Sequence, residues 1–252
     1  MIVGVIQVRM GSTRLAGKAL ADLYGQPLLL RLYERVNAAK TLDKIVIATG
    51  SGKENRPIVD FAALHGIRCV VGSETDLVER YLRVVRDTGA TAMLRVTGDC
   101  PLADPALIDE MVYYYKAEAN RFDYVTNALR PTHPDGLDLD IFSTAVLNRI
   151  DGTVQDAFWR EWFTSYLREN AALFRVHNIE NATDLSNLRW TVDYEEDLVF
   201  VNAVFSHLYP AKPIFGMQDI LELLVREPQL KDINHKHTRD AAYHAAKKEQ
   251  GK

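Results

Sequence analysis

One stretch decides the fold of this chain: Val3-Gly4-Val5-Ile6-Gln7-Val8-Arg9-Met10-Gly11-Ser12-Thr13-Arg14-Leu15-Ala16-Gly17-Lys18. An apolar, β-branched run leads directly into a loop that holds two arginines, a lysine and several small residues. Small side chains leave backbone N–H groups accessible and long cationic ones supply positive charge, and both features suit a polyphosphate. Each charge-assisted hydrogen bond contributes about 1.5–3 kcal/mol, so three cations and several amides suffice to hold a triphosphate.

This loop matches neither of two well-known phosphate-binding patterns. Gly11 and Gly17 are separated by one residue too many for G-x-x-x-x-G-K-[ST], and Ala19 stands where that pattern needs a hydroxyl. The G-x-G-x-x-G spacing is also absent. Two interpretations stay open: a phosphate loop of another kind, and a solvated surface loop that happens to be basic.

Around this loop, short apolar runs alternate with amphipathic segments. The alternation predicts βαβ units and a mostly parallel α/β sheet flanked by helices and buried on both faces. Ligands on such sheets bind at the carboxyl ends of the strands, where the opening loop lies. The predicted strands are residues 2–8, 44–49, 67–71, 93–97 and 123–127, and the predicted helices are residues 27–39, 56–65, 75–88 and 105–116.

The pattern is looser after residue 128. Strands are predicted at 138–142, 174–179 and 187–192, with a helix at 156–170. We therefore expect a single domain over residues 1–252. It would have a nucleotide-binding half (1–127), an acceptor-side half (128–233) and a polar tail (234–252) that forms a fraying helix.

Composition narrows the class of protein. Hydrophobic residues make up 47% and charged residues 25% of the chain, which is typical of a soluble globule. The net charge of −4 argues against broad nucleic-acid binding. Cys69 and Cys100 are too few for a disulfide framework, so we expect a reducing, cytoplasmic environment. No signal peptide or membrane insertion is expected.

Two aspartates follow predicted strands. Asp99, in Thr97-Gly98-Asp99-Cys100-Pro101, suits magnesium, which takes one or two carboxylates from a protein. The alternative for Asp99 is turn chemistry before a proline. Asp193 also suits the metal, although Asp193 and Glu196 have the spacing of a capping box at the start of a helix. Metal binding and capping are compatible.

Other side chains are weaker candidates. Asp138 and Asp140 are two residues apart, so a strand would point both to one face, toward a metal, acceptor hydroxyls or solvent. Arg80 either reaches the nucleotide or pairs along its own helix. His235 and His237 are expected to be solvated, and Trp159 and Trp162 to form one helical core stripe.

With these segments together, the chain resembles the cytidylyltransferases of the spore-coat polysaccharide biosynthesis protein F type, relatives of the CMP-Kdo and CMP-acylneuraminate synthetases. The matching segments are residues 7–18, 97–101, 135–138 and 188–193. The resemblance implies a nucleotidyltransferase fold of the GT-A-like, Rossmann-like kind, a homodimer, and CTP and a sugar-like acceptor as substrates, with Mg²⁺ as cofactor.

The resemblance also implies roles for individual residues. Arg14, Lys18 and Asp99 would be catalytic, and Asp99 and Asp193 would hold the metal. Arg160 belongs to the acceptor region, where Trp162 stands in place of a family histidine, and Ala16 replaces a loop proline. The nucleotide would be bound by Arg9, Met10, Gly11, Ser12, Arg14, Lys18, Arg80 and Asp99, and the acceptor by Asp138, Asp140 and Arg160.

Three functions are therefore weighed. The first is transfer of CMP from CTP to a sugar-like acceptor with release of pyrophosphate, in cell-surface polysaccharide biosynthesis. The second is a GT-A-type glycosyltransferase, because Asp138-Leu139-Asp140 formally matches a D-x-D metal motif. The third is a non-catalytic scaffold, for which the change at Trp162 leaves room.

Overall fold

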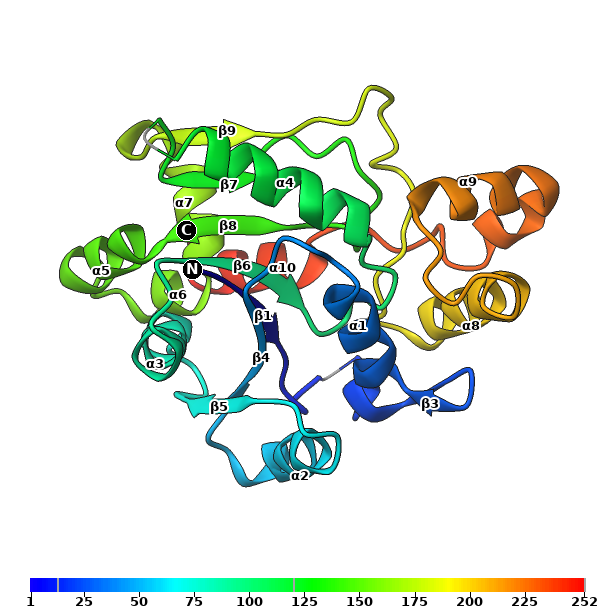
Figure 1. The fold of residues 1–252 in the computed structure, drawn as a ribbon, viewed down its shortest axis with the longest axis horizontal. Coiled ribbons are helices and arrows are strands. Elements are labelled where there is room, and N and C mark those ends of the chain that lie inside the picture. The colour runs from blue at the N-terminus through cyan, green and yellow to red at the C-terminus, as the bar shows by residue number, and fades with distance from the viewer. Residues whose placement is uncertain (13, 120, 252) are drawn as a thin grey trace.

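A seven-stranded sheet forms the centre of the computed structural model, which describes residues 1–12, 14–119 and 121–251 (Figure 1). Thr13, within the opening loop, lies outside the described residues. The strand order is β5-β4-β1-β6-β8-β7-β9. The strands are β1 (Ile2–Gln7), β4 (Lys44–Gly50), β5 (Cys69–Gly72), β6 (Ala92–Thr97), β7 (Tyr124–Thr126), β8 (Asp140–Ser143) and β9 (Val176–Asn178), with a small hairpin of β2 (Asp22–Leu23) and β3 (Gln26–Pro27).

The sheet is mostly parallel, as predicted. β8 runs antiparallel to both of its neighbours, and the remaining pairs in this sheet are parallel. From β1 the chain builds β4 and β5 on one side and then crosses to place β6 on the other side. The strand order therefore reverses between β1 and β6, and such a reversal opens a crevice at the carboxyl ends of the two strands.

A glycine keeps these two strand ends close together. A Cβ atom on Gly98 would lie 2.6 Å from the Cβ of Val8, so a larger residue would force the ends of β1 and β6 apart. The Gly98 N–H also donates to the carbonyl of Gln7 at 2.8 Å. The loops after both strands consequently begin side by side.

Helices cover both faces of the sheet (Figure 1). Successive strand residues point to opposite faces, so the neighbours Val5 and Ile6 belong to different hydrophobic clusters. One cluster packs under α1, α2, α4, α8 and α9, and the other under α3, α5 and α7. The helices are α1 (Leu28–Asn37), α2 (Arg56–Leu64), α3 (Leu77–Thr88), α4 (Pro105–Ala117), α5 (Thr144–Thr153), α6 (Ala157–Glu161), α7 (Phe163–Glu169), α8 (Glu195–Leu208), α9 (Met217–Arg226) and α10 (Ala241–Glu249).

The second half departs from the sequence predictions in three places. Residues 187–192 form an irregular segment with one isolated bridge, because their backbone bonds to the loops at Asp99 and Asp135 while the fully buried Trp190 joins the hydrophobic core. The helix predicted at 156–170 is two helices, α6 and α7, interrupted at Trp162. The third place is the tail, which forms the expected helix as α10, but this helix packs onto the body of the protein and buries Tyr243.

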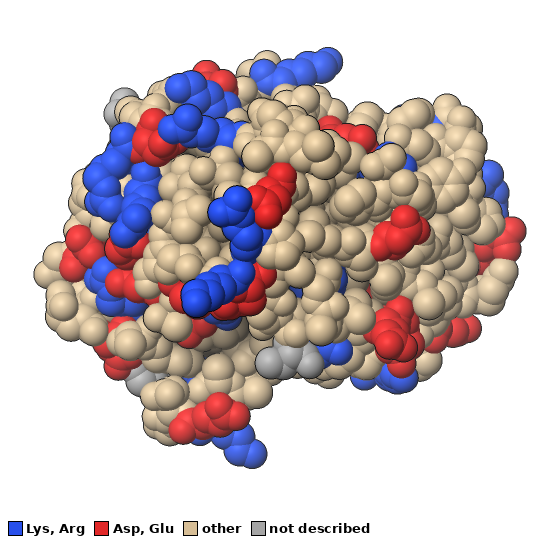
Figure 2. Space-filling view, turned by 90° about the horizontal axis from the view of Figure 1, so that it is seen from below, with Lys and Arg blue, Asp and Glu red and all other residues tan. Residues whose placement is uncertain are grey.

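The surface seen from below carries intermixed charges. On this face basic and acidic side chains are interspersed, more densely toward one end of the molecule, with a broader neutral area toward the other (Figure 2). No helix in the described ranges combines the length and the apolar character needed to cross a bilayer.

Candidate active site

Lys18 lies where the two halves of the chain meet. Its ammonium nitrogen Nζ is 3.0 Å from Asp99 Oδ2 and 2.8 Å from Asp193 Oδ1, and it also donates to the carbonyl of Val192 at 2.8 Å. Arg14 Nη2 donates to the same oxygen of Asp193 at 2.7 Å. The structure therefore brings together the cationic loop and both predicted metal-binding aspartates, although they are far apart in sequence.

Asp99 is positioned by the turn that ends β6. The Cys100 N–H donates to the Thr97 carbonyl at 3.1 Å and closes this turn. The Asp99 carbonyl accepts from the Val192 N–H at 2.8 Å and from the Thr191 hydroxyl at 3.1 Å. These two bonds attach the irregular segment to the end of β6 and so place Asp193 near Asp99.

Asp193 does not cap the following helix. The N–H groups of Asp193 and Tyr194 both donate to Asp197 Oδ2, at 2.9 and 3.0 Å. The capping box predicted for Asp193 and Glu196 is therefore wrong, because Asp197 provides the capping carboxylate and Glu196 pairs with Lys236 instead. The Asp193 carboxylate is consequently left for Arg14, Lys18 and Arg189.

Mutual charge compensation sets the ionisation of this cluster. Burial opposes ionisation of Asp99, but the Lys18 ammonium outweighs it and holds the pKa of Asp99 well below its usual range. Burial likewise opposes the charge on Lys18, and Asp99 and Asp193 raise its pKa above the ordinary value. Asp99 and Lys18 are therefore both charged at neutral pH.

A cavity of about 290 Å³ opens beside the cluster, between the loops that follow β1 and β6. Most of the predicted nucleotide-binding residues reach its wall. Met10 does not, since it packs against the core while its N–H donates to Asn55 Oδ1 at 2.8 Å. The predicted residues on the wall are Arg9, Gly11, Ser12, Arg14, Lys18, Arg80 and Asp99.

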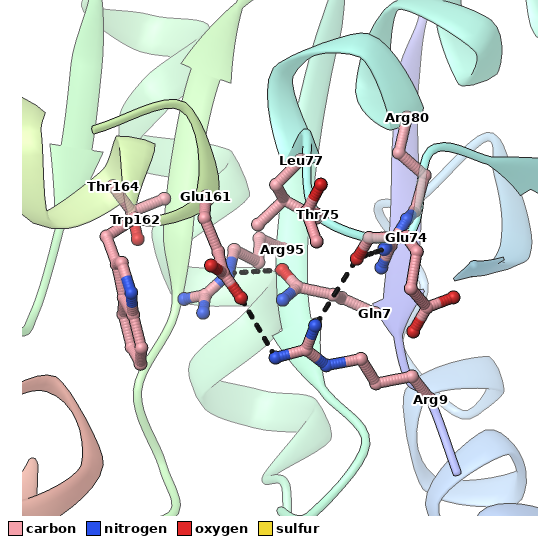
Figure 3. Close-up of a pocket in the computed structure, with 10 residues that line it drawn as sticks. All are labelled: Gln7, Arg9, Glu74, Thr75, Leu77, Arg80, Arg95, Glu161, Trp162 and Thr164. Atoms are coloured by element: carbon pink, nitrogen blue, oxygen red, sulfur yellow. Dashed lines mark hydrogen bonds and ion pairs between the residues drawn. The ribbon is translucent and has the colours of Figure 1, made fainter. Parts of the chain in front are cut away.

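A smaller recess of about 60 Å³ adjoins this cavity (Figure 3). Arg9 spans its mouth, donating to Glu161 at 3.0 Å and to the Glu74 carbonyl at 3.3 Å. Arg80 is buried and donates to the carbonyls of Ser73 and Glu74, so it fixes the loop before α3 rather than pairing along its helix. The Trp162 ring stands at the opposite side of the recess (Figure 3).

A third cavity, of about 180 Å³, lies on the acceptor side of Asp99 and Asp193. Asp138 lines it, but Asp140 does not, because Asp138 precedes β8 whereas Asp140 lies within it. Asp140 has no exposed surface and pairs with Arg95 at 2.7 Å and, more loosely, with Arg168 at 3.4 Å.

Arg160 is also absent from the wall of this third cavity. Its guanidinium joins Asp76 and Asp151, each at 2.7 Å. The structure therefore brings Asp138 to the third cavity, whereas Asp140 and Arg160 are not on its wall and form ion pairs with other segments.

Two carboxyls of the third cavity keep their protons unusually well. Burial, reinforced by Asp138, raises the pKa of Asp135 to about 7, even though Arg189 lies 2.9 Å away. Burial also raises the pKa of Asp138 to about 6, against the opposing charge of Arg239. These carboxyls change protonation near neutral pH, whereas Asp99 does not.

Several functional candidates were missed by sequence reasoning. Asp135 stood within a matched motif and was not singled out, although Gly136 beside it has φ of 108° and a Cβ there would lie 2.5 Å from the Thr191 nitrogen. Trp162 lines all three cavities instead of joining a core stripe. His237 stacks on Tyr194 at 3.7 Å between ring centres, rather than being solvated. Nothing in the polar tail indicated that α10 forms part of the third cavity.

A mostly parallel sheet with a cationic loop and two aspartates at its reversal point defines the α/β fold of nucleotidyltransferases. A sequence model of the family described as cytidylyltransferase matches residues 3–229. The chain therefore belongs to the cytidylyltransferase family, and the fold and the resemblance inferred from the sequence are confirmed.

Relatives agree with this assignment. The spore coat polysaccharide biosynthesis protein SpsF of Bacillus subtilis is 32% identical, over 90% of this chain and 95% of SpsF. A 3-deoxy-manno-octulosonate cytidylyltransferase of Trichlorobacter lovleyi is 37% identical over 44% of this chain and 43% of that protein.

Solved structures share the fold. A cytidylyltransferase from Leptospira borgpetersenii has a TM-score of 0.87 and 29% identity, covering 91% of this chain and 96% of its own. Rv0371C from Mycobacterium tuberculosis, in complex with manganese, has a TM-score of 0.54 and 16% identity, covering 80% of this chain and 98% of its own.

Proposed function

We propose that this cytidylyltransferase transfers CMP from CTP to a sugar-like acceptor, with release of pyrophosphate, in the synthesis of a cell-surface polysaccharide. One observation carries the proposal: Arg14 and Lys18 meet Asp99 and Asp193 at one edge of the sheet, beside a cavity with room for a ligand. The biosynthetic setting is supported by the similarity to SpsF.

The cationic loop would hold the triphosphate. Arg9, Arg14 and Lys18 carry fixed charge to the cavity of about 290 Å³, and Gly11 and Ser12 line the same wall. A Cβ on Gly11 would meet no atom within 4 Å, so a ligand can approach the backbone closely there. Met10 would act from below the loop by fixing its backbone to Asn55, and Arg80 by shaping the adjoining recess.

A divalent cation fits the carboxylates that are present. Asp99 and Asp193 both direct an oxygen at the Lys18 Nζ, so the two carboxylates converge on one point. Among the described residues, no cluster of three or more His, Cys, Asp and Glu forms a preformed metal cage. This suits Mg²⁺, which binds through one or two carboxylates together with substrate phosphates and water. The manganese complex of the Mycobacterium relative supports a divalent ion.

The reaction joins an acceptor oxygen to the α-phosphorus of CTP. As that bond forms, the bond from the α-phosphorus to the oxygen bridging the β-phosphorus breaks, and the acceptor loses its proton. A bound Mg²⁺ would supply charge neutralisation and a lower acceptor pKa. Arg14 and Lys18 would stabilise the departing pyrophosphate, and Asp138 would accept hydrogen bonds from acceptor hydroxyls.

The alternative of a glycosyltransferase loses its support at Asp140. A D-x-D metal motif needs both carboxylates at the ligand, but Asp140 is fully buried and neutralised by Arg95. A binding comparison separates the two activities, because a cytidylyltransferase binds CTP more tightly than nucleotide-diphosphate sugars.

The test is pyrophosphate release from CTP with a panel of monosaccharides, sugar acids and sugar phosphates. We expect release to need both an acceptor and Mg²⁺ and to stop with EDTA. Absence of CTP binding by calorimetry, together with equal background release for every acceptor, would refute the proposal. We further propose that the protein is a cytoplasmic homodimer. Light scattering on the purified protein measures its mass and so tests whether it is a dimer.

A further inference from the structure

We propose that the C-terminal helix α10 is the specificity element for the acceptor: it walls the third cavity, excludes water from it and decides which acceptors fit. This inference rests on the proposed function. It concerns a part of the chain beyond residues 3–229, which are the residues matched by the family model.

The start of α10 forms one side of the third cavity. Asp240, Ala241, Ala242 and Tyr243 line this cavity together with Asp99. Ala242 also lines the cavity of about 290 Å³. This residue therefore stands where the two cavities adjoin, next to the place where the α-phosphorus and the acceptor oxygen have to meet.

Two separate anchors hold α10 in place. At its beginning, Arg239 pairs with Asp138 and donates to the His133 carbonyl at 3.2 Å. Further along, the Tyr243 hydroxyl and the Lys247 ammonium both bond to Glu169, at the end of α7. Both anchors are polar and half-buried, so they hold the helix without merging it into the hydrophobic core.

Aromatic rings extend this wall across to α6. The Tyr243 ring lies 5.3 Å from Trp162 and 6.1 Å from Phe158, measured between ring centres. Trp162 interrupts the helices α6 and α7 and reaches all three cavities. Tyr243 and Trp162 therefore form one continuous surface, and a change in α10 shifts the ring that faces the acceptor.

The wall has two chemical consequences. A cavity of about 180 Å³ is below the roughly 300 Å³ at which ordinary ligand pockets begin, so it favours a small acceptor, and α10 supplies one of its sides. Helix α10 also shields one side of the site, so less bulk water reaches the α-phosphorus in place of the acceptor. Opening the wall should admit larger acceptors and allow water to convert CTP to CMP and pyrophosphate.

The experiment loosens α10 from either side without altering a cavity residue. Arg239→Ala removes the first anchor, and Glu169→Gln weakens the second from the neighbouring helix. Lys248→Ala is the matched control, because it removes an exposed charge from the same helix. Hydrogen exchange over residues 241–249 reports the loosening and shows whether the rest of the fold is intact. The acceptor panel is then repeated for each protein, alongside CTP binding and acceptor-free pyrophosphate release.

We expect both anchor variants to keep the CTP dissociation constant, to raise KM for the preferred acceptor roughly tenfold, and to release more pyrophosphate without acceptor. In the anchor variants, the rate of pyrophosphate release with larger acceptors should rise relative to the rate with the preferred acceptor. Lys248→Ala should give the same rates as the parent. The inference is overturned if α10 exchanges faster in either variant while acceptor range, KM and acceptor-free release stay at parental values. Failure of the parent itself to bind CTP would instead remove the proposed function, and this inference with it.

Discussion

The cavity of about 290 Å³, which we propose for the nucleotide, and the cavity of about 180 Å³, which we propose for the acceptor, share Asp99 but are built in different ways. The first is framed by loops that leave neighbouring parallel strands, and its charged groups are paired with one another by bonds of 2.7–3.0 Å. The second is enclosed by an irregular segment, an interrupted helix and the terminal helix α10. Its carboxyls Asp135 and Asp138 have raised pKa values rather than lowered ones.

This difference separates what a fold class provides from what one chain adds. Strand ends at a reversal point form a ligand site wherever this topology occurs, so the fold explains why the cationic loop and Asp99 lie together. The acceptor side depends on contacts between segments that the sheet does not fix. Changes on the first side should therefore abolish the chemistry, whereas changes on the second should alter its preferences and pH response.

The largest effect is expected for Asp99→Asn. The substitution keeps the size of the side chain but removes the charge that faces Lys18, so CMP transfer should fall by about 10²–10³-fold while CTP binding changes much less. Pyrophosphate release and calorimetry measure the two quantities. Equally small effects on both would favour a non-catalytic scaffold over an enzyme.

Lys18→Met should lower stability more than any exposed substitution. It leaves the carboxylates of Asp99 and Asp193 without their shared cation. The cost should lie between the roughly 1 kcal/mol of an exposed pair and the roughly 3 kcal/mol of a buried one, because these contacts are partly buried. Urea unfolding measures the loss. Mg²⁺ should restore part of it, since the ion would occupy the point where the two carboxylates converge, and an unchanged midpoint with Mg²⁺ would contradict the metal assignment.

Asp135→Asn should alter how stability depends on pH. Asp135 has a folded-state pKa of about 7 against 3.8 for the ordinary group, so the folded state holds its proton more tightly. This stabilisation is complete below pH 3.8 and is lost as pH rises through 7.

Relative to the parent, the variant should therefore gain about 4 kcal/mol of unfolding free energy between pH 4 and pH 8. Denaturant titrations at both values measure the gain. Asp60→Asn, at an exposed carboxylate, should show no such gain and serves as the control.

The smallest effect separates two residues of one ion pair. Arg9→Ala and Glu161→Gln both break an exposed contact, so each should cost less than about 1 kcal/mol of stability. Only Arg9→Ala should weaken CTP binding, by roughly three- to tenfold, because it removes a charged donor from the cavity. Equal weakening by both variants would show that Arg9 acts through the pair rather than on the nucleotide.

The same division explains how far the sequence could be interpreted. Hydrophobic periodicity predicted β1, β4, β5 and β6, and the motifs at two of their ends predicted that Lys18 would meet Asp99. Periodicity failed at residues 187–192, because an irregular segment that buries its side chains in the core is as apolar as a strand. It also gave no reason to separate Asp138 from Asp140, since their orientation depends on where β8 begins.

The wall that α10 and Trp162 form along the third cavity was harder still to predict from the sequence. Trp162 stands at the interruption between α6 and α7 and lines the cavities, and a helical pattern shows neither feature. Tyr243 finds its partners on α6 and α7, about eighty residues earlier, through contacts that no local pattern encodes. Long-range packing of this kind needs coordinates.

The ion pairs among Lys18, Arg14, Asp99 and Asp193 have a consequence for which anions the site binds. These four side chains carry no net charge as a group, so an inorganic anion gains little by separating them. A nucleotide that carries its own divalent cation would offer phosphate oxygens to Lys18 and the cation to the two carboxylates at the same time. Such a site would ignore abundant bare phosphate and respond to the ion-loaded nucleotide.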